Sequence, residues 1–239
     1  MPHQSLLEIP VLQPPDMANY VAGKNQQLID LFASILAKLK ISASVGYASL
    51  YIWGETAGHT HLLHAFHDLA QQKHIKSICL SLQHMIQPER VFADMGSHYQ
   101  LIMLDDLEAG LRDQATEQAL LCLFHEVSMH NRLLVLSSHL HMDQCAWMLP
   151  DLKTRMQSGL VWQLQPLDDM EQKQLFKTYI TRYGFAVQDA VIDYLWTRLS
   201  RNPHEQLAAL KQLMQQALQY KQKINMKNMK KFLDDAHTR

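Results

Sequence analysis

The stretch that decides the fold of this chain is residues 50–65, which read Leu50-Tyr51-Ile52-Trp53-Gly54-Glu55-Thr56-Ala57-Gly58-His59-Thr60-His61-Leu62-Leu63-His64-Ala65. An apolar run typical of a strand enters a glycine-containing turn, and a helical pattern follows it. In such an arrangement backbone N–H groups and a helix N-terminus can bind phosphate groups. The usual pattern of this loop is G-x-x-x-x-G-K-[ST]. Aligned on Gly58 and Thr60, the chain has Trp53 in place of the first glycine and His59 in place of the lysine.

The composition is that of a globular protein of moderate size. The chain has 239 residues, 47% of them hydrophobic and 19% charged, so it can bury a sizeable core. Its formal net charge is −1, so the net electrostatic field of the chain is too weak to be the basis for binding DNA or a membrane surface. No apolar run is long enough to span a bilayer, and the first five residues lack the features of a signal peptide. The three cysteines are scattered and indicate reduced thiols in a cytoplasmic protein: Cys79, Cys122 and Cys145.

Short apolar runs alternate with helical patterns up to residue 165. Strands are predicted near residues 47–53, 76–82, 99–104, 132–137 and 160–164, with helices at 26–39, 60–73 and 114–131. This alternation favours an α/β fold with a parallel sheet. From residue 166 onward only helical patterns follow, at 171–183, 188–199, 203–222 and 226–236. We therefore predict an extended arm at residues 1–22, an α/β domain at 23–165 and a helical domain at 166–239.

Two carboxylates follow one of the predicted strands. Leu101-Ile102-Met103-Leu104 is apolar and runs into Asp105-Asp106. At the carboxyl end of a strand beside a phosphate loop, such acids hold Mg²⁺ and a water molecule. A strand that merely enters a polar loop is the alternative. The preceding phosphate-loop pattern favours the magnesium interpretation.

These motifs together resemble the bacterial initiator DnaA, an AAA+ ATPase, over about residues 18–236. His61–Ala65 is very similar to the sequence after the phosphate-loop lysine of that family, and Asp105-Asp106 falls at its Walker B acids. The other matching segments are Tyr20–Asn25 before the first helix, Leu133–His139 at sensor 1, Leu152–Met156 with the arginine finger at Arg155, Asn202–Leu207 at sensor 2, and Ile224–Lys227 before the last lid helix. The resemblance implies an AAA+ type parallel-sheet P-loop domain with a C-terminal helical lid.

Among DnaA-like proteins of this size, the chain is most similar to the Hda family, the regulatory inactivators of DnaA. That family carries an N-terminal peptide that binds the DNA polymerase sliding clamp, and Gln4-Ser5-Leu6-Leu7-Glu8-Ile9 fits its spacing. An extended peptide of this kind offers a polar anchor and apolar side chains to a preformed pocket. The resemblance implies partner-binding residues Gln4, Leu6, Leu7 and Ile9, with DnaA and the sliding clamp as partners. A homo-oligomer is a further partner that this architecture allows.

The chain departs from the family pattern at cationic positions. His59 replaces the lysine and His204 the sensor-2 arginine, and histidine is mostly neutral at pH 7. The resemblance implies binding of ADP or ATP with Mg²⁺, and the metal would be held through Thr60 and Asp105. The substitutions at positions 59 and 204 weaken the expectation that nucleotide binds. The implied nucleotide-binding residues are Gly54, Gly58, His59, Thr60, His61, Asp105, Asp106 and His204.

The expected function is negative regulation of replication initiation. Bound to the clamp, the chain would stimulate hydrolysis of DnaA-bound ATP through Arg155, without independent catalysis of its own. A DnaA-like or helicase-loader ATPase that hydrolyses its own nucleotide is the main alternative. A DNA-binding adaptor that uses the basic C-terminal helices is a second one, which the near-neutral charge disfavours. Histidines at positions 61, 64 and 67 could share a helix face, but no cysteine or acid completes a dedicated metal site there.

Overall fold

The computed structural model describes residues 17, 20–42, 44–55, 58–111, 113–182 and 188–198. Its described residues up to Pro166 belong to one compact unit, and those from Leu167 onward to a second. The two units are treated separately below. Most of the predicted arm and the predicted helices at 203–222 and 226–236 lie outside the described residues.

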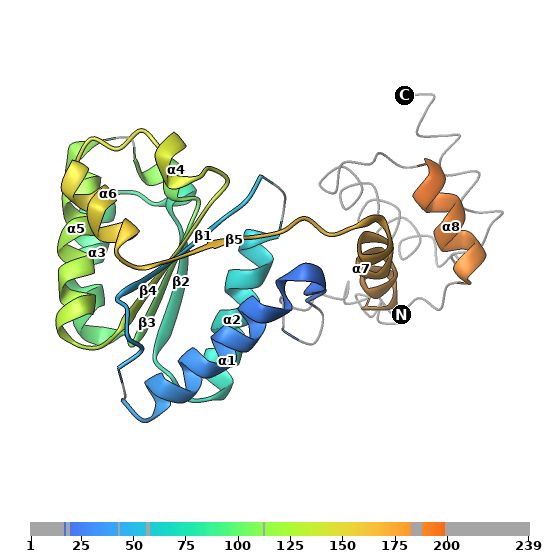
Figure 1. Ribbon diagram of the computed structural model, residues 1–239, viewed down its shortest axis with the longest axis horizontal. Coiled ribbons are helices and arrows are strands. Elements are labelled where there is room, and N and C mark those ends of the chain that lie inside the picture. Colours follow the sequence, from blue (N-terminus) through green and yellow to red (C-terminus); the bar gives the residue numbers. More distant parts are fainter. Residues whose placement is uncertain are drawn as a thin grey trace, which may run out of the picture. The chain divides into compact units, whose positions relative to one another are not determined.

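The first unit is built on a five-stranded parallel sheet, which confirms the predicted α/β fold (Figure 1). The strand order is β2-β3-β4-β1-β5. Because all strands are parallel, their carboxyl ends meet at one edge of the sheet and their amino ends at the other. The strands are β1 (Ser49–Trp53), β2 (Ser77–Ser81), β3 (Leu101–Asp105), β4 (Leu133–Ser138) and β5 (Leu160–Gln163).

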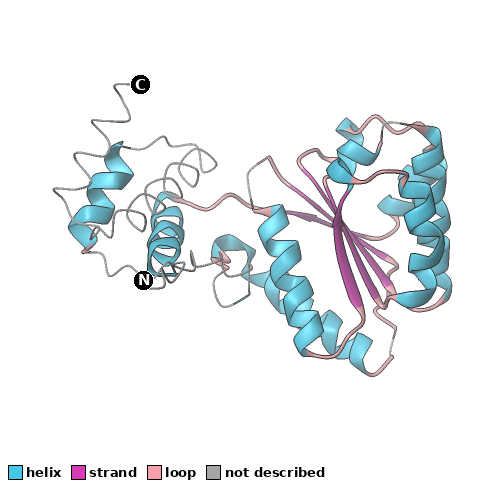
Figure 2. Ribbon diagram, turned by 180° about the vertical axis from the view of Figure 1, so that it is seen from behind, coloured by secondary structure: helices cyan, strands magenta, loops and turns pink. Residues whose placement is uncertain are grey.

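Helices cover both faces of this sheet (Figure 2). Side chains on a strand point alternately to opposite faces, so Leu50 and Ile52 enter one core while Tyr51 enters the other. The first core lies under α1 (Gln26–Lys40) and α2 (His59–Gln72). The second lies under α3 (Pro88–His98), α5 (Gln114–Met129) and α6 (Pro150–Gln157), and the short α4 (Leu107–Gly110) also contributes to it. With both faces covered, the central strands β1, β3 and β4 are almost entirely buried, as their continuous apolar runs predict.

Three helices of this unit are not predicted by the sequence patterns: α3, α6 and the four-residue α4. Both α3 and α6 begin with a proline in the first turn, Pro88 and Pro150, where the missing N–H costs nothing. They have 11 and 8 residues, and each buries only a few side chains. A short helix with a narrow apolar stripe gives little periodicity, so the packing against α5 and the sheet decides its formation.

The second unit contributes two described helices, α7 (Asp169–Arg182) and α8 (Asp189–Arg198), where helices are predicted. They pack through Phe176 and Trp196, whose ring centroids are 6.4 Å apart in an edge-to-face arrangement. Lys177 Nζ lies 2.7 Å from Asp189 Oδ1 and adds an exposed ion pair between the two helices. No described helix of either unit is long and apolar enough to cross a membrane.

Candidate functional site

The phosphate-loop candidate connects β1 to α2 at the carboxyl edge of the sheet. Its last described residue before the helix is Gly58, whose φ of 134° is one that only glycine adopts without strain. Thr56 and Ala57 lie outside the described residues. A strand, a turn with glycine at a positive φ and a helix N-terminus therefore follow one another, as the sequence predicts.

Gly54 allows the backbone that follows β5 to approach the start of this loop. A Cβ atom on Gly54 would lie 2.7 Å from the carbonyl oxygen of Leu164, which leaves no room for any side chain. The Leu164 N–H donates a 2.6 Å hydrogen bond to the Trp53 carbonyl, and the Gly54 N–H donates to Ser138 at 3.2 Å. In the described structure, the need for glycine at this position comes from close backbone packing.

Asp105 lies beside the loop at the end of β3 and is held by two hydroxyl groups. The Thr60 hydroxyl donates a 2.6 Å hydrogen bond to Asp105 Oδ2, and the Ser137 hydroxyl donates to Oδ1. The carboxylate is buried, with 4% of the residue exposed. A hydroxyl and a carboxylate are hard oxygen ligands of the kind that Mg²⁺ prefers, so Thr60 and Asp105 fit the predicted magnesium pair. Sequence reasoning does not single out Ser137, which reaches Asp105 from the neighbouring strand β4.

Asp106 points away from this pair. Its backbone is left-handed, with φ 58° and ψ 50°, and its Oδ2 accepts a 2.6 Å hydrogen bond from the hydroxyl of Ser81, the last residue of β2. The two neighbouring carboxylates therefore have different surroundings. Asp105 belongs to the loop side of the sheet edge, and Asp106 ties the start of α4 to β2.

His59 occupies the position of the phosphate-binding lysine but is only 3% exposed. Neither ring nitrogen has a hydrogen-bond partner among the described residues, and the ring lies edge-on to His139 with centroids 5.0 Å apart. Burial, and to a smaller extent the neighbouring His139, lowers the pKa of His59 to about 4 against the opposing effect of Asp105 and Glu108. At pH 7 this imidazole is neutral, so it supplies no positive charge to a phosphate.

Glu108 is a further acid at this edge that the sequence motifs do not reveal. Its Oε1 accepts a 3.3 Å hydrogen bond from the backbone N–H of His139, while its buried Oε2 has no partner in the described part of the chain. Glu108 lies on α4, three residues after Asp105. This closeness to Asp105 in the chain is the only sequence signal for a role of Glu108 at the site. His61 faces elsewhere, with its ring 5.6 Å from that of Tyr20.

Arg155 lies on α6, far along the chain from the loop and at the other edge of the sheet. Helix α6 ends just before the amino end of β5, whereas the phosphate loop follows the carboxyl end of the parallel strand β1. The Arg155 side chain is 48% exposed, and its Nε lies 3.4 Å from Asp151 Oδ1 one helical turn earlier. The guanidinium is therefore available at the surface, and the structure places it apart from the chain's own phosphate loop.

A buried glutamate on α5 holds the start of α6. The Glu117 carboxylate is fully buried and accepts hydrogen bonds from the backbone N–H groups of Met148, at 2.9 Å, and Leu149, at 2.8 Å. These donors precede Pro150, so Glu117 satisfies N–H groups at the helix N-terminus and fixes the helix that carries Arg155. The sequence signal for this role is a charged residue on the buried face of a helix, in line with Leu120 and Phe124.

The remaining predicted residues lie outside the described part: Gln4, Leu6, Leu7, Ile9 and His204. Among the described residues, no group of three or more His, Cys, Asp or Glu side chains stands together as a metal-binding cluster.

Known proteins resemble this chain over most of its length. An uncharacterized protein of Haemophilus influenzae is 27% identical over 232 residues, which are 95% of this chain and 98% of that protein. The fold matches domain III of the Thermotoga maritima replication initiation protein DnaA with a TM-score of 0.75 and 18% identity, over 94% of this chain and 98% of that one. AMPPCP-bound DnaA from Aquifex aeolicus matches with a TM-score of 0.69 and 22% identity, over 84% of this chain and 66% of that one.

The architecture is that of an AAA+ type parallel-sheet domain followed by helices, in agreement with the fold of these DnaA structures. The sequence profile of the bacterial DnaA ATPase domain matches residues 15–163, which is more than half of the chain. This match spans the phosphate loop, the acid pair and Arg155. The chain belongs to the family of the bacterial DnaA ATPase domain.

Proposed function

We propose that this protein is a negative regulator of replication initiation that stimulates hydrolysis of DnaA-bound ATP while it is bound to the sliding clamp. The observation that carries the proposal is the position of Arg155. Its guanidinium is exposed at the sheet edge opposite the chain's own phosphate loop. An arginine in that position can reach a nucleotide held by a neighbouring AAA+ protein.

The chemistry supports an arginine supplied to a partner. Charge accumulates on the transferred phosphoryl group during ATP hydrolysis, and a guanidinium supplied in trans stabilises it by roughly three to five decades in rate. Glu117 supports this role because it fixes the helix on which Arg155 sits. The exposed ion pair with Asp151 is worth about 0–1 kcal/mol, which is small enough to be exchanged for a phosphate.

The residues at the chain's own phosphate loop support binding of a nucleotide more than they support hydrolysis of that nucleotide. Thr60 and Asp105 form the pair that would hold Mg²⁺, which would neutralise charge between the phosphates of a bound nucleotide. The Aquifex DnaA structure was determined with AMPPCP, an adenine nucleotide analogue. The neutral, buried His59 removes one phosphate-binding cation, so we propose that this chain binds adenine nucleotide weakly, with ADP preferred over ATP.

Arg155→Ala tests the mechanism. Hydrolysis of DnaA-bound ATP, measured with clamp loaded on DNA, should fall by roughly three decades or more. Because the side chain is exposed, the melting temperature should stay unchanged. Arg90→Ala removes an exposed arginine from α3 and serves as the matched control, with full stimulation expected. A stable Arg155→Ala protein that still drives hydrolysis at the original rate would remove Arg155 from the mechanism.

Clamp binding is tested at the N-terminal peptide. The spacing of Gln4, Leu7 and Ile9 supports an extended peptide with one polar anchor and apolar side chains. Replacing Gln4 and Leu7 with alanine should abolish binding to purified clamp and leave the melting temperature unchanged. Undiminished binding by this double variant would show that the chain uses another surface.

The alternative function is hydrolysis of the chain's own ATP, favoured by the intact pairing of Thr60 with Asp105. A nucleotide turnover assay on the isolated protein separates the two. Turnover that survives Arg155→Ala and is lost in Asp105→Asn would support the alternative.

A further inference from the structure

The C-terminal ends of α1 and α2 lie at the amino edge of the sheet, because α1 precedes β1 and α2 precedes β2 (Figures 1 and 2). Each helix ends in a turn that contains a non-glycine residue with a left-handed backbone, Ser42 with φ 53° and His74 with φ 60°. Backbone hydrogen bonds return from these turns to the last carbonyls of each helix. The two turns therefore present their side chains in a defined arrangement.

One side chain joins the two turns. Gln100, the residue before β3, donates a 3.1 Å hydrogen bond from Nε2 to the Leu39 carbonyl, and its Oε1 accepts a 3.2 Å hydrogen bond from the Lys76 N–H. The end of α1 and the segment after α2 thus lie on either side of a single amide group. This contact gathers lysines from two distant parts of the chain, which we call the lysine patch: Lys38, Lys40, Lys73 and Lys76.

The lysine patch has one sign of charge. All four lysines are exposed, and none of them has an ion pair in the described part of the chain. The sequence has no aspartate or glutamate at residues 31–54 or 69–88. Three other lysines each lie against an aspartate: Lys153, Lys173 and Lys177. The formal net charge of −1 therefore conceals a locally cationic surface.

Part of this pattern has a structural explanation. A cation at the C-terminal end of a helix stabilises it by about 0.3–1 kcal/mol. Lys38 also donates a 3.3 Å hydrogen bond from Nζ to the Val45 carbonyl, which holds the segment after α1. Lys76 is not explained in this way, because it lies beyond the end of α2 and directly before β2. The lack of acids from both turns is not explained either.

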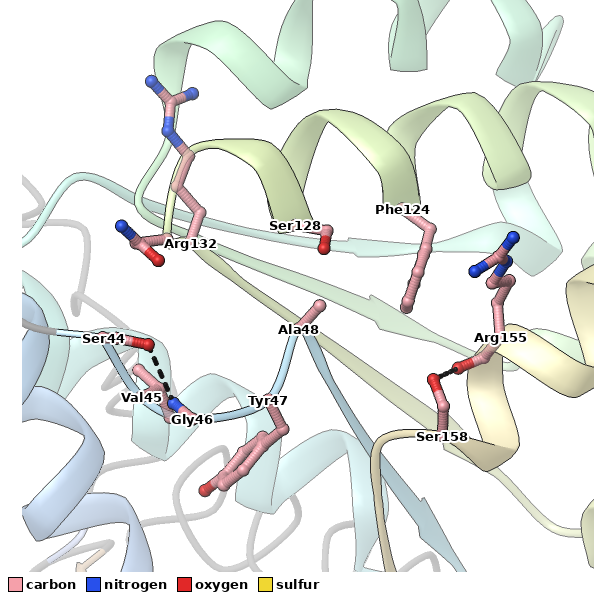
Figure 3. Close-up of a pocket in the computed structure, with 11 residues that line it drawn as sticks. Ser44, Val45, Gly46, Tyr47, Ala48, Phe124, Ser128, Arg132, Arg155 and Ser158 are labelled. Atoms are coloured by element: carbon pink, nitrogen blue, oxygen red, sulfur yellow. Dashed lines mark hydrogen bonds between the residues drawn. The ribbon is translucent and has the colours of Figure 1, made fainter.

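Two arginines lie at the same edge of the sheet. Arg132 and Arg155 are among the residues that line a cavity of about 320 Å³ together with the segment 44–48 (Figure 3). Arg155 already has a role in the proposed function, and Arg132 has a buried Nη1 atom that does not face solvent. The lysine patch is the exposed cationic part of this edge that no assigned role uses.

We propose that the lysine patch binds the phosphate backbone of duplex DNA without regard to base sequence. Lysine contacts phosphate as a flexible point charge, and contacts to the backbone carry no sequence information. Charges in physiological salt are screened beyond about 8 Å. A bound duplex therefore responds to these nearby lysines and not to the net charge of the chain.

The composition of the patch favours duplex DNA over other anionic partners. The centres of protein interfaces are enriched in aromatic residues and arginine and depleted in lysine. Helices that bind membrane surfaces combine basic residues with several large apolar ones. Among the described residues of 38–46 and 71–76, the one exposed large apolar side chain is Ile41. The exposed residues of these turns include no Phe, Tyr or Trp on which single-stranded bases could stack.

Contacts of this kind are weak alone, with a dissociation constant of about 10⁻⁴–10⁻⁶ M at physiological salt. In the proposed function the clamp is loaded on DNA, so the duplex is already close to the bound chain. A weak contact then acts as a second attachment. The binding itself does not rest on the proposed function, and only this use of it does.

The experiment titrates a fluorescent duplex of about 30 base pairs with the full chain, without clamp, DnaA or nucleotide, at about 50–200 mM salt. The logarithm of the association constant should fall with the logarithm of salt concentration with a slope of roughly −3 to −4, as for about four phosphate contacts. Lys40→Gln, Lys73→Gln, Lys76→Gln should weaken binding at least about tenfold and bring the slope to about −1. Lys38 is retained because it holds Val45.

A second triple variant is the matched control. Lys153→Gln, Lys173→Gln, Lys177→Gln changes the net charge by the same amount, at lysines that are already paired with aspartates. Its affinity for the duplex should stay within about twofold of the parent. Arginine at positions 40, 73 and 76 keeps the charge and should keep the salt dependence. If the first triple variant does not fold, Lys76→Gln alone should reduce the slope by about one.

The outcomes decide between the explanations. Undiminished binding in the patch variant, or an equal loss in both triple variants, would overturn the inference. Absence of duplex binding by the parent protein at about 50 mM salt would also overturn it, even if the patch bound phosphatidylglycerol vesicles instead. If the duplex binds through these lysines but the protein does not stimulate hydrolysis of DnaA-bound ATP, the inference stands and the proposed function falls. Stimulation by a protein that does not bind duplex DNA would have the opposite meaning.

Discussion

The hydroxyl of Thr60 and the carboxylate of Asp105, 45 positions apart in the chain, meet in a 2.6 Å hydrogen bond. The contact joins the first turn of α2 to the end of β3. Asp105 is buried, so its charge depends on this donor and on Ser137 for compensation. The pair therefore contributes both to stability and to the oxygen ligands that the nucleotide site offers.

Thr60→Val should separate these two contributions. Valine keeps the shape of threonine but removes the hydroxyl, which leaves Asp105 Oδ2 without that donor and should cost about 1–3 kcal/mol of unfolding free energy. Mg²⁺-dependent nucleotide binding should weaken in the same variant. Urea unfolding and nucleotide titration with and without Mg²⁺ provide the measurements.

Thr154→Val is the matched control for this change. The Thr154 hydroxyl is exposed and donates only to the Pro150 carbonyl in its own helix, so its loss should cost within about 0.5 kcal/mol. Equal losses in the two variants would mean that the contact with Asp105 has no special value.

The burial of His59 should make stability depend on pH. Its pKa lies at about 4 in the folded chain and near 6.5 in the unfolded chain, so the unfolded state binds the proton more readily between these values. Stability is therefore highest above pH 6.5 and falls as the pH drops toward 4. For this one group the loss between pH 7 and pH 4.5 should be roughly 2–3 kcal/mol.

His59→Leu should remove that part of the pH dependence, as measured by urea unfolding at the two pH values. His67, whose pKa burial also lowers, will leave a smaller dependence of the same sign. His130→Gln provides the control, because His130 is about half exposed beside Glu126. A pH dependence unchanged by His59→Leu would show that this ring is hydrated in solution.

Gly159 should not tolerate a side chain. A Cβ atom there would lie 2.5 Å from the backbone oxygen of Ser49 and closer still to its hydroxyl, so β5 would have to move away from β1. Gly159→Ala should cost about 1–3 kcal/mol in thermal or urea unfolding. Adding Ser49→Ala should restore only part of the loss, since the backbone contact remains.

Gly46→Ala distinguishes this clash from backbone strain. Gly46 has a φ of 97° but nothing within 4 Å of a Cβ atom, so its substitution meets strain without collision. Full rescue of Gly159→Ala by Ser49→Ala would contradict the argument from the backbone contact.

The sequence by itself determined the strands of the first unit and three of its six described α-helices, α1, α2 and α5. Continuous apolar runs such as Leu101–Leu104 are long enough to identify buried strands, and the helical spacing of Leu28, Ile35 and Leu39 identifies a helix. These signals are local, because the period of the pattern follows from the geometry of one element. Helices α3, α4 and α6 were not predicted, because their stability comes from packing rather than from their own periodicity.

The sequence and its resemblance to DnaA also predicted which residues form the candidate site: Gly58, Thr60, Asp105 and Arg155. Only the tertiary structure decided their surroundings. It buried His59 without a partner, brought Ser137 to Asp105 from another strand, and set Arg132 and Arg155 around one cavity. Burial and charge compensation depend on contacts between residues distant in the chain, and no local pattern encodes them.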